Sequence, residues 1–84
     1  MTTIAEVYWS AYRAAMAADE AWSAALHERY GRNAGDARYD SRGTDGPYLY
    51  GLGAAKLAAD VAVRKAWDRV CQAGGISAAA GVEV

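Results

Sequence analysis

Hydrophobic positions in the first third of the chain recur with a helical period. At 100° per residue, one stripe collects most of the apolar side chains: Ile4, Tyr8, Ala11, Ala15, Ala18, Trp22 and Leu26. The opposite side is mostly polar, and neither Gly nor Pro interrupts the pattern. Thr3 and Glu6 have the spacing of a capping box, and Gly31 is placed to end a helix. This pattern predicts an amphipathic helix over about residues 3–30.

A second periodic segment predicts a helix over about residues 47–73. Its apolar stripe consists of Leu52, Ala55, Ala59, Val63, Ala66 and Val70. Asp45 is a suitable N-cap, Pro47 fits the first turn, and Gly74 with Gly75 marks the end. The first half of this helix has almost no polar side. We therefore expect it to be buried on more than one side.

The two segments predict an all-α fold in a single domain, residues 1–84. We expect an antiparallel two-helix hairpin with a long loop over 31–46 and a loose tail over 74–84. Small Ala residues allow the helix axes to approach closely. Larger side chains should fill the two ends of the hairpin: Trp22, Leu26 and Leu52 near the loop, and Ile4, Tyr8 and Val70 near the termini. Because one hairpin buries little surface, dimerisation into a helical bundle is a further expectation.

Composition and charge narrow the function classes. A net charge of −1 gives no general attraction to nucleic acid or anionic membranes. No secretory signal or membrane-length apolar run is present, so we expect a cytoplasmic protein without a membrane. Cys71 and His27 are each the sole residue of their type and would lie far apart in a hairpin. We expect no metal, no cofactor and no catalytic residues, and hence no enzyme.

Two groups of residues are candidate partner-binding surfaces. The loop carries Arg32, Arg38, Tyr39 and Arg42, residue types that are frequent at binding hot spots. The alternative for the loop is that its Arg and Asp side chains pair with one another and cap the helix ends. Trp9, Tyr12 and Met16 form the second group, away from the main apolar stripe of the first helix. For Trp9 and Met16 the alternative is that the loop or the tail covers them.

The loop also carries a resemblance. Residues 30–43, YGRNAGDARYDSRG, resemble a YGxxAGDxRYDxRG-like loop of small helical phage and prophage proteins from high-GC bacteria. The matching positions are Gly31, Gly35, Asp36, Arg38, Tyr39, Asp40, Arg42 and Gly43. The resemblance implies no catalytic role. Some phage proteins of this size inhibit host defence, and anti-CRISPR proteins are among them.

The sequence therefore favours a non-enzymatic protein-binding module. Its most specific form is a phage-encoded inhibitor of a bacterial defence complex, such as a CRISPR-Cas complex, acting in the host cytoplasm. One alternative is a small nucleic-acid-binding or regulatory protein that uses Arg32, Arg38, Arg42, Arg64, Lys65 and Arg69. Another is a structural homo-oligomer, in which the apolar first half of the second helix forms a homodimer core.

Overall fold

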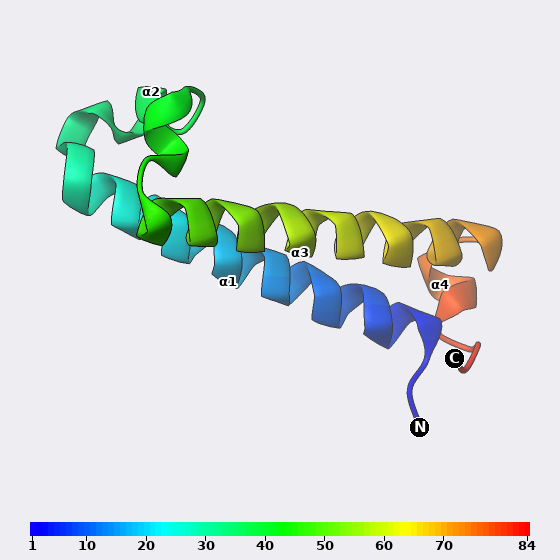
Figure 1. The fold of residues 1–84 in the computed structure, drawn as a ribbon. Coiled ribbons are helices and arrows are strands. Elements are labelled where there is room, and N and C mark those ends of the chain that lie inside the picture. Colours follow the sequence, from blue (N-terminus) through cyan, green and yellow to red (C-terminus); the bar gives the residue numbers. More distant parts are fainter. The chain divides into compact units, whose positions relative to one another are not determined.

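The computed structural model describes all residues, 1–84, and its regular elements are all helices, apart from one isolated β-bridge between Thr3 and Glu83. The elements are α1 (Ile4–Tyr30), η1 (Gly31–Asn33), α2 (Ala34–Ala37), η2 (Ser41–Thr44), α3 (Pro47–Gln72) and α4 (Ile76–Ala79). The long helices α1 and α3 run antiparallel (Figure 1). This confirms the predicted all-α hairpin. The connection between them is not structureless, because it contains three short helical turns.

Local signals at the helix ends act largely as predicted. The Thr3 hydroxyl accepts a hydrogen bond from the Glu6 backbone N–H at 3.1 Å, which caps the start of α1. Gly31 follows α1 with φ of 59°, in the left-handed region that favours glycine. Gly74 and Gly75 also have positive φ, and the Gly75 N–H donates to the Val70 carbonyl at 3.0 Å. This bond satisfies a carbonyl in the last turn of α3.

The predicted N-cap role of Asp45 is not what the structure shows. Helix α3 begins at Pro47 after Gly46, whose φ is 89°. The Asp45 carboxylate instead accepts a hydrogen bond from the Arg29 guanidinium at 2.8 Å. Because Gly46, and not Asp45, directly precedes the first residue of α3, the Asp45 side chain is free to pair with Arg29 at the end of α1.

The chain divides into two compact units, which are described separately. Unit 1 comprises residues 1–15 and 59–84, and unit 2 comprises residues 16–58. The core of unit 1 contains Ala5, Val70 and Ala79, with Ile4 and Tyr8 packed against them. The predicted grouping of Ile4, Tyr8 and Val70 is therefore confirmed.

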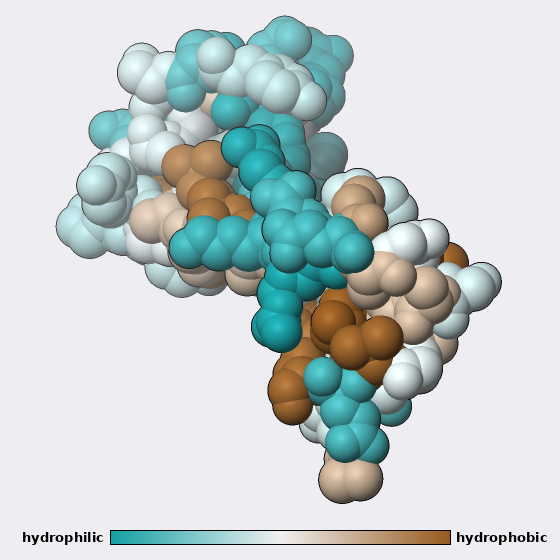
Figure 2. Space-filling view, turned by 90° about the vertical axis from the view of Figure 1, so that its right-hand side faces the viewer, coloured by the Kyte–Doolittle hydropathy of each residue, from teal (hydrophilic) through white to brown (hydrophobic).

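The tail of the chain belongs to the core of unit 1 and is not loose. Helix α4 places Ala79 in full burial, and the following residues return to the N-terminus (Figure 1). Ile4 N–H donates to the Val82 carbonyl at 2.8 Å, and Val84 N–H donates to the Thr2 carbonyl at 3.0 Å. Hydrophobic surface is still visible between hydrophilic patches on the face where α4 and the termini lie (Figure 2).

The core of unit 2 is built around Trp22 and Leu26 of α1. Ala25, Ala34 and Leu49 complete its buried part, and Tyr30 and Leu52 pack against it from partly exposed positions. The predicted grouping of Trp22, Leu26 and Leu52 is confirmed. Leu49, which the predicted stripe of the second helix omitted, is almost fully buried.

Several large apolar side chains remain exposed. Trp9 and Met16 are each close to half exposed, so neither the loop nor the tail covers them. Tyr50 and Leu57, in the apolar first half of α3, are also exposed. The first half of α3 is therefore not buried on a second side in the single chain, contrary to the expectation from its sequence.

Candidate functional site

Trp22 connects α1 to the loop and to α3 within unit 2. Its indole N–H donates a hydrogen bond to the Gly43 carbonyl at 2.9 Å. Glycine is required at this contact, because a Cβ on Gly43 would lie 2.7 Å from the Ala37 carbonyl oxygen and 3.3 Å from the Trp22 ring. On the α3 side, a Cβ on Gly53 would lie 3.6 Å from the same ring and 3.2 Å from the Thr44 methyl group. Glycines thus let two backbone segments approach one indole.

Arg38 covers another part of Trp22. Its guanidinium carbon lies 4.6 Å from the centroid of the Trp22 ring, a cation–π geometry. One terminal nitrogen donates to the Ser23 hydroxyl at 2.8 Å, and the other pairs with the Asp19 carboxylate. The side chain of Arg38 is about one-fifth exposed. Its orientation is therefore set by three contacts from α1.

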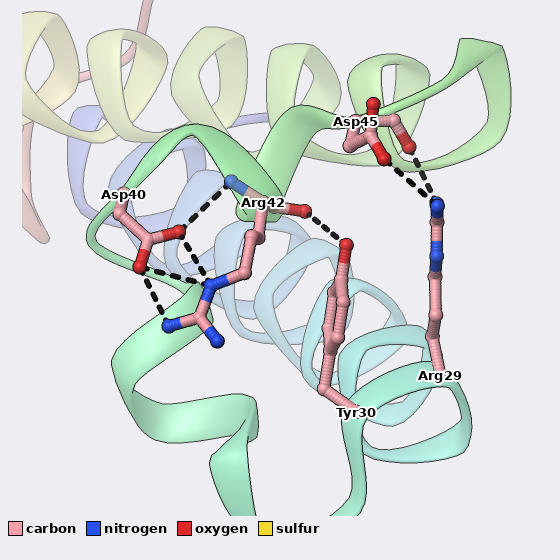
Figure 3. Close-up of polar contacts among 5 residues, drawn as sticks. All are labelled: Arg29, Tyr30, Asp40, Arg42 and Asp45. Atoms are coloured by element: carbon pink, nitrogen blue, oxygen red, sulfur yellow. Dashed lines mark hydrogen bonds and ion pairs between the residues drawn. The ribbon is translucent and has the colours of Figure 1, made fainter.

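Asp40 and Arg42 of the loop pair with each other (Figure 3). The Asp40 carboxylate accepts hydrogen bonds from the backbone N–H of Arg42 at 2.8 Å and from its guanidinium at 2.7 Å. These bonds hold the pKa of Asp40 below its usual range, and Asp40 in turn raises the pKa of Arg42. The Tyr30 hydroxyl donates to the Arg42 carbonyl at 2.9 Å, which ties this turn to the end of α1.

A further ion pair joins the end of α1 to the residues before α3. The Arg29 guanidinium donates to the Asp45 carbonyl at 2.7 Å and to its carboxylate at 2.8 Å (Figure 3). Three of the arginines in unit 2, at positions 29, 38 and 42, therefore have acidic partners in the same unit. Internal pairing and capping within the loop, the alternative that the sequence left open, is present at Asp40 and Arg42.

Beside this scaffold lies an open groove with a volume of about 400 Å³. Its floor includes Trp22, Gly53 and Ala54. Tyr39 and Tyr50 line it with side chains that are 86% and 66% exposed, and Leu57 is also 66% exposed. Apolar grooves of this volume with a few polar groups are typical of binding sites. We refer to this feature as the aromatic groove.

The aromatic groove contains only some of the residues that were predicted from the sequence to bind a partner. Arg38 and Tyr39 line it, whereas Arg32 and Arg42 do not. Sequence reasoning missed Tyr50 and Leu57. The available signal was the lack of a polar side over the first half of α3, which was interpreted as burial.

Trp9 and Tyr12 belong to a separate aromatic cluster in unit 1. The Tyr8 ring lies 5.0 Å from Trp9 and 5.3 Å from Trp67, measured between centroids. Trp9 and Tyr12 meet edge to face at 6.0 Å. These aromatic rings stabilise one another through edge-to-face and tilted contacts. Met16, the third residue of that predicted surface, belongs to unit 2.

No three metal-ligating side chains lie together as a metal site would need. Neither long helix has an apolar stretch sufficient to cross a lipid bilayer. Cys71 is an exposed free thiol in unit 1. Comparison of the chain with protein-family models, curated proteins and solved structures gave no match.

Proposed function

We propose that the protein is a non-enzymatic binding module that docks onto another protein through the aromatic groove. The observation that carries this proposal is the exposure of Tyr39, Tyr50 and Leu57 around a floor formed by Trp22. Large apolar side chains held open on a rigid scaffold are characteristic of protein contact sites. The loop contributes Arg38, which is held by Asp19 and Ser23, and the exposed Tyr39 to the lining of the groove.

The pairing of the loop arginines supports a protein partner over nucleic acid. Binding to phosphates depends on cations that can release counterions, and Arg38 and Arg42 are already matched by Asp19 and Asp40. The net charge of −1 supplies no compensating excess of positive charge. The alternative is a nucleic-acid-binding role. It requires an affinity for DNA or RNA that falls steeply as the salt concentration rises.

The specific form that we propose is an inhibitor that occupies a surface of a bacterial defence complex, such as a CRISPR-Cas complex. This form rests on the resemblance of residues 30–43 to loops of small phage proteins. It is tested by interference assays in a bacterium with an active CRISPR-Cas system. Restored phage growth on expression of the protein would support it, and undiminished interference across the effector types tried would discard this specific form.

The general proposal is tested by affinity capture from bacterial lysate with matched variants. Wild type should retain a defined protein that Tyr50→Ala with Leu57→Ala fails to retain. Tyr48→Ala is the control, because Tyr48 is 70% exposed yet lies outside the aromatic groove. Equal capture by all three proteins would contradict docking through the groove. A wild-type dimer that the double variant breaks would assign the groove to self-association instead.

A further inference from the structure

We propose that the chain forms an antiparallel homodimer through the face of α1 that carries Trp9 and Tyr12, so that a second copy of the chain covers that face. The residues of this face belong to unit 1, whereas those that line the aromatic groove belong to unit 2. The inference therefore goes beyond the proposed function and does not depend on it. It follows from an exposed aromatic platform and from two unpaired charges on the same helix.

The aromatic platform spans α3 and α1 within unit 1. The Trp67 ring lies 5.3 Å from the Tyr8 ring, which lies 5.0 Å from the Trp9 ring, measured between centroids. Tyr12 meets Trp9 at 6.0 Å. Trp9, Tyr12 and Trp67 are nevertheless 45%, 42% and 45% exposed. Because the rings already restrain one another, little side-chain entropy would be lost when a second copy covers them.

The exposed area of the platform suits a small interface. An aromatic side chain offers about 150–250 Å², so the three exposed rings leave roughly 200–330 Å² uncovered in each copy. A standard interface buries about 800 Å² on each side. The rings can therefore form the centre of a contact at the small end of the range. We expect a weak, reversible dimer that forms at high protein concentration.

Two charges make this face of α1 complementary to itself. Glu6 and Arg13 are two helical turns apart, about 10 Å along the helix axis, and they share one stripe next to that of Trp9. Both residues are exposed, and neither side chain takes part in an ion pair or a hydrogen bond within the chain. The midpoint between the two positions lies at the level of Trp9.

This spacing selects the antiparallel arrangement. A twofold axis that crosses α1 at right angles near Trp9 places Glu6 of one copy opposite Arg13 of the other, and the symmetry forms this pair twice. If the same faces paired in parallel, each charge would lie at the level of its own counterpart, and the like charges would repel one another. A second copy in antiparallel orientation thus supplies both the apolar contact and the matching charges.

The test is the molar mass of the full-length protein over a concentration series, measured by sedimentation equilibrium. We expect wild type to show a monomer–dimer equilibrium with a dissociation constant in the micromolar range. Glu6→Arg and Arg13→Glu should each weaken dimerisation by about tenfold, because both symmetric pairs then bring like charges together. Lys65→Glu, at an exposed position of α3, is the control and should leave dimerisation unchanged. Circular dichroism establishes that each variant is as helical as wild type.

A mixture of the two charge variants tests the orientation. In a mixed dimer, the two arginines of the Glu6→Arg chain face the two glutamates of the Arg13→Glu chain. The mixture should therefore dimerise at least as tightly as wild type, although neither variant does so alone. At about 1 M salt the differences between the variants should largely disappear, because exposed charges are screened. A mixture that dimerises no better than its components would overturn the inference.

Substitution of the rings identifies the face. Trp9→Ala with Tyr12→Ala should stay monomeric at concentrations at which wild type dimerises. The groove variant, Tyr50→Ala with Leu57→Ala, should dimerise like wild type. A wild-type protein that stays monomeric at every concentration would overturn the inference. A dimer that only the groove variant loses would overturn it as well, because the contact would then lie in unit 2.

Discussion

The indole N–H of Trp22 donates to the Gly43 carbonyl at 2.9 Å, and this bond joins the middle of α1 to the interhelical loop. Trp22→Phe would keep most of the ring volume and leave that carbonyl without its donor. We expect unfolding to become easier by about 1–2 kcal/mol, the cost of one lost buried hydrogen bond. Urea denaturation followed by circular dichroism measures the change. Trp9→Phe, at an exposed ring, should leave the midpoint nearly unchanged.

Gly43 tolerates no side chain, because an added Cβ would lie 2.7 Å from the Ala37 carbonyl oxygen. Gly43→Ala should therefore destabilise the protein by about 1–3 kcal/mol through overpacking against backbone. Gly35→Ala is the matched control, since a Cβ there meets nothing within 4 Å. It should be neutral or slightly stabilising because alanine reduces the freedom of the unfolded chain. The melting temperatures of the two variants measure the difference. Equal shifts from the wild-type melting temperature would contradict this prediction.

The pair formed by Arg38 and Asp19 should be coupled in stability. The Arg38 side chain is 21% exposed and that of Asp19 is 40% exposed, so solvent screens part of the attraction. A double-mutant cycle with Arg38→Ala and Asp19→Ala should give a coupling energy of about 0.5–1 kcal/mol. If the effects of the two substitutions on the free energy of unfolding simply add, Arg38 stabilises the protein mainly through its contacts with Trp22 and Ser23.

Asp40 should make stability dependent on pH in the acid range. Hydrogen bonds from Arg42 lower its pKa in the folded protein, so the folded state favours the carboxylate. Its contribution is therefore fully present above the unfolded-state pKa of about 3.9 and is lost as the pH falls through the lower folded-state pKa. Between about pH 5 and pH 2, wild type should lose more stability than Asp40→Asn in parallel urea titrations. Parallel slopes for the two proteins would contradict this assignment.

The C-terminal tail should detach from the core of unit 1 when a charged residue replaces a buried one. Ala79 is fully buried beside Ala5 and Val70, so Ala79→Asp would force a carboxylate into an apolar cluster. The amide of Ile4, bonded to Val82, should then exchange with deuterium about tenfold faster or more. The neighbouring variant Ala78→Asp, at an exposed position, should leave that exchange rate unchanged.

Much of the fold could be predicted because local signals and tertiary packing agree. The 3.6-residue period that places Trp22 and Leu26 on one stripe is the period that buries them in unit 2. Gly31 and Gly74 end their helices with positive φ, as their positions indicated. The tail was misjudged because the contacts of Ala79 and Val82 are non-local. Ile76 precedes Ala79 by about one helical turn, but α4 has only four residues, too few for a period to be recognised in the sequence.

The candidate site was harder to predict from the sequence. Arg38 and Tyr39 were nominated from residue type, but the ion pair with Asp19 depends on how the loop folds back on α1. The exposure of Tyr50 and Leu57 could not be read from their apolar character, since the same pattern is typical of buried helices. Burial is decided by which segment covers a face, and here none does.

Trp22 is the sole tryptophan of unit 2, whereas Trp9 and Trp67 both belong to unit 1. A protein carrying Trp9→Phe and Trp67→Phe would therefore contain one intrinsic fluorophore, located at the floor of the aromatic groove. The emission wavelength of Trp22 would report the polarity inside the aromatic groove, and its emission intensity would fall if a quenching group entered the groove. The same indole that fastens the loop would thus serve as an optical probe of occupancy, without an attached dye.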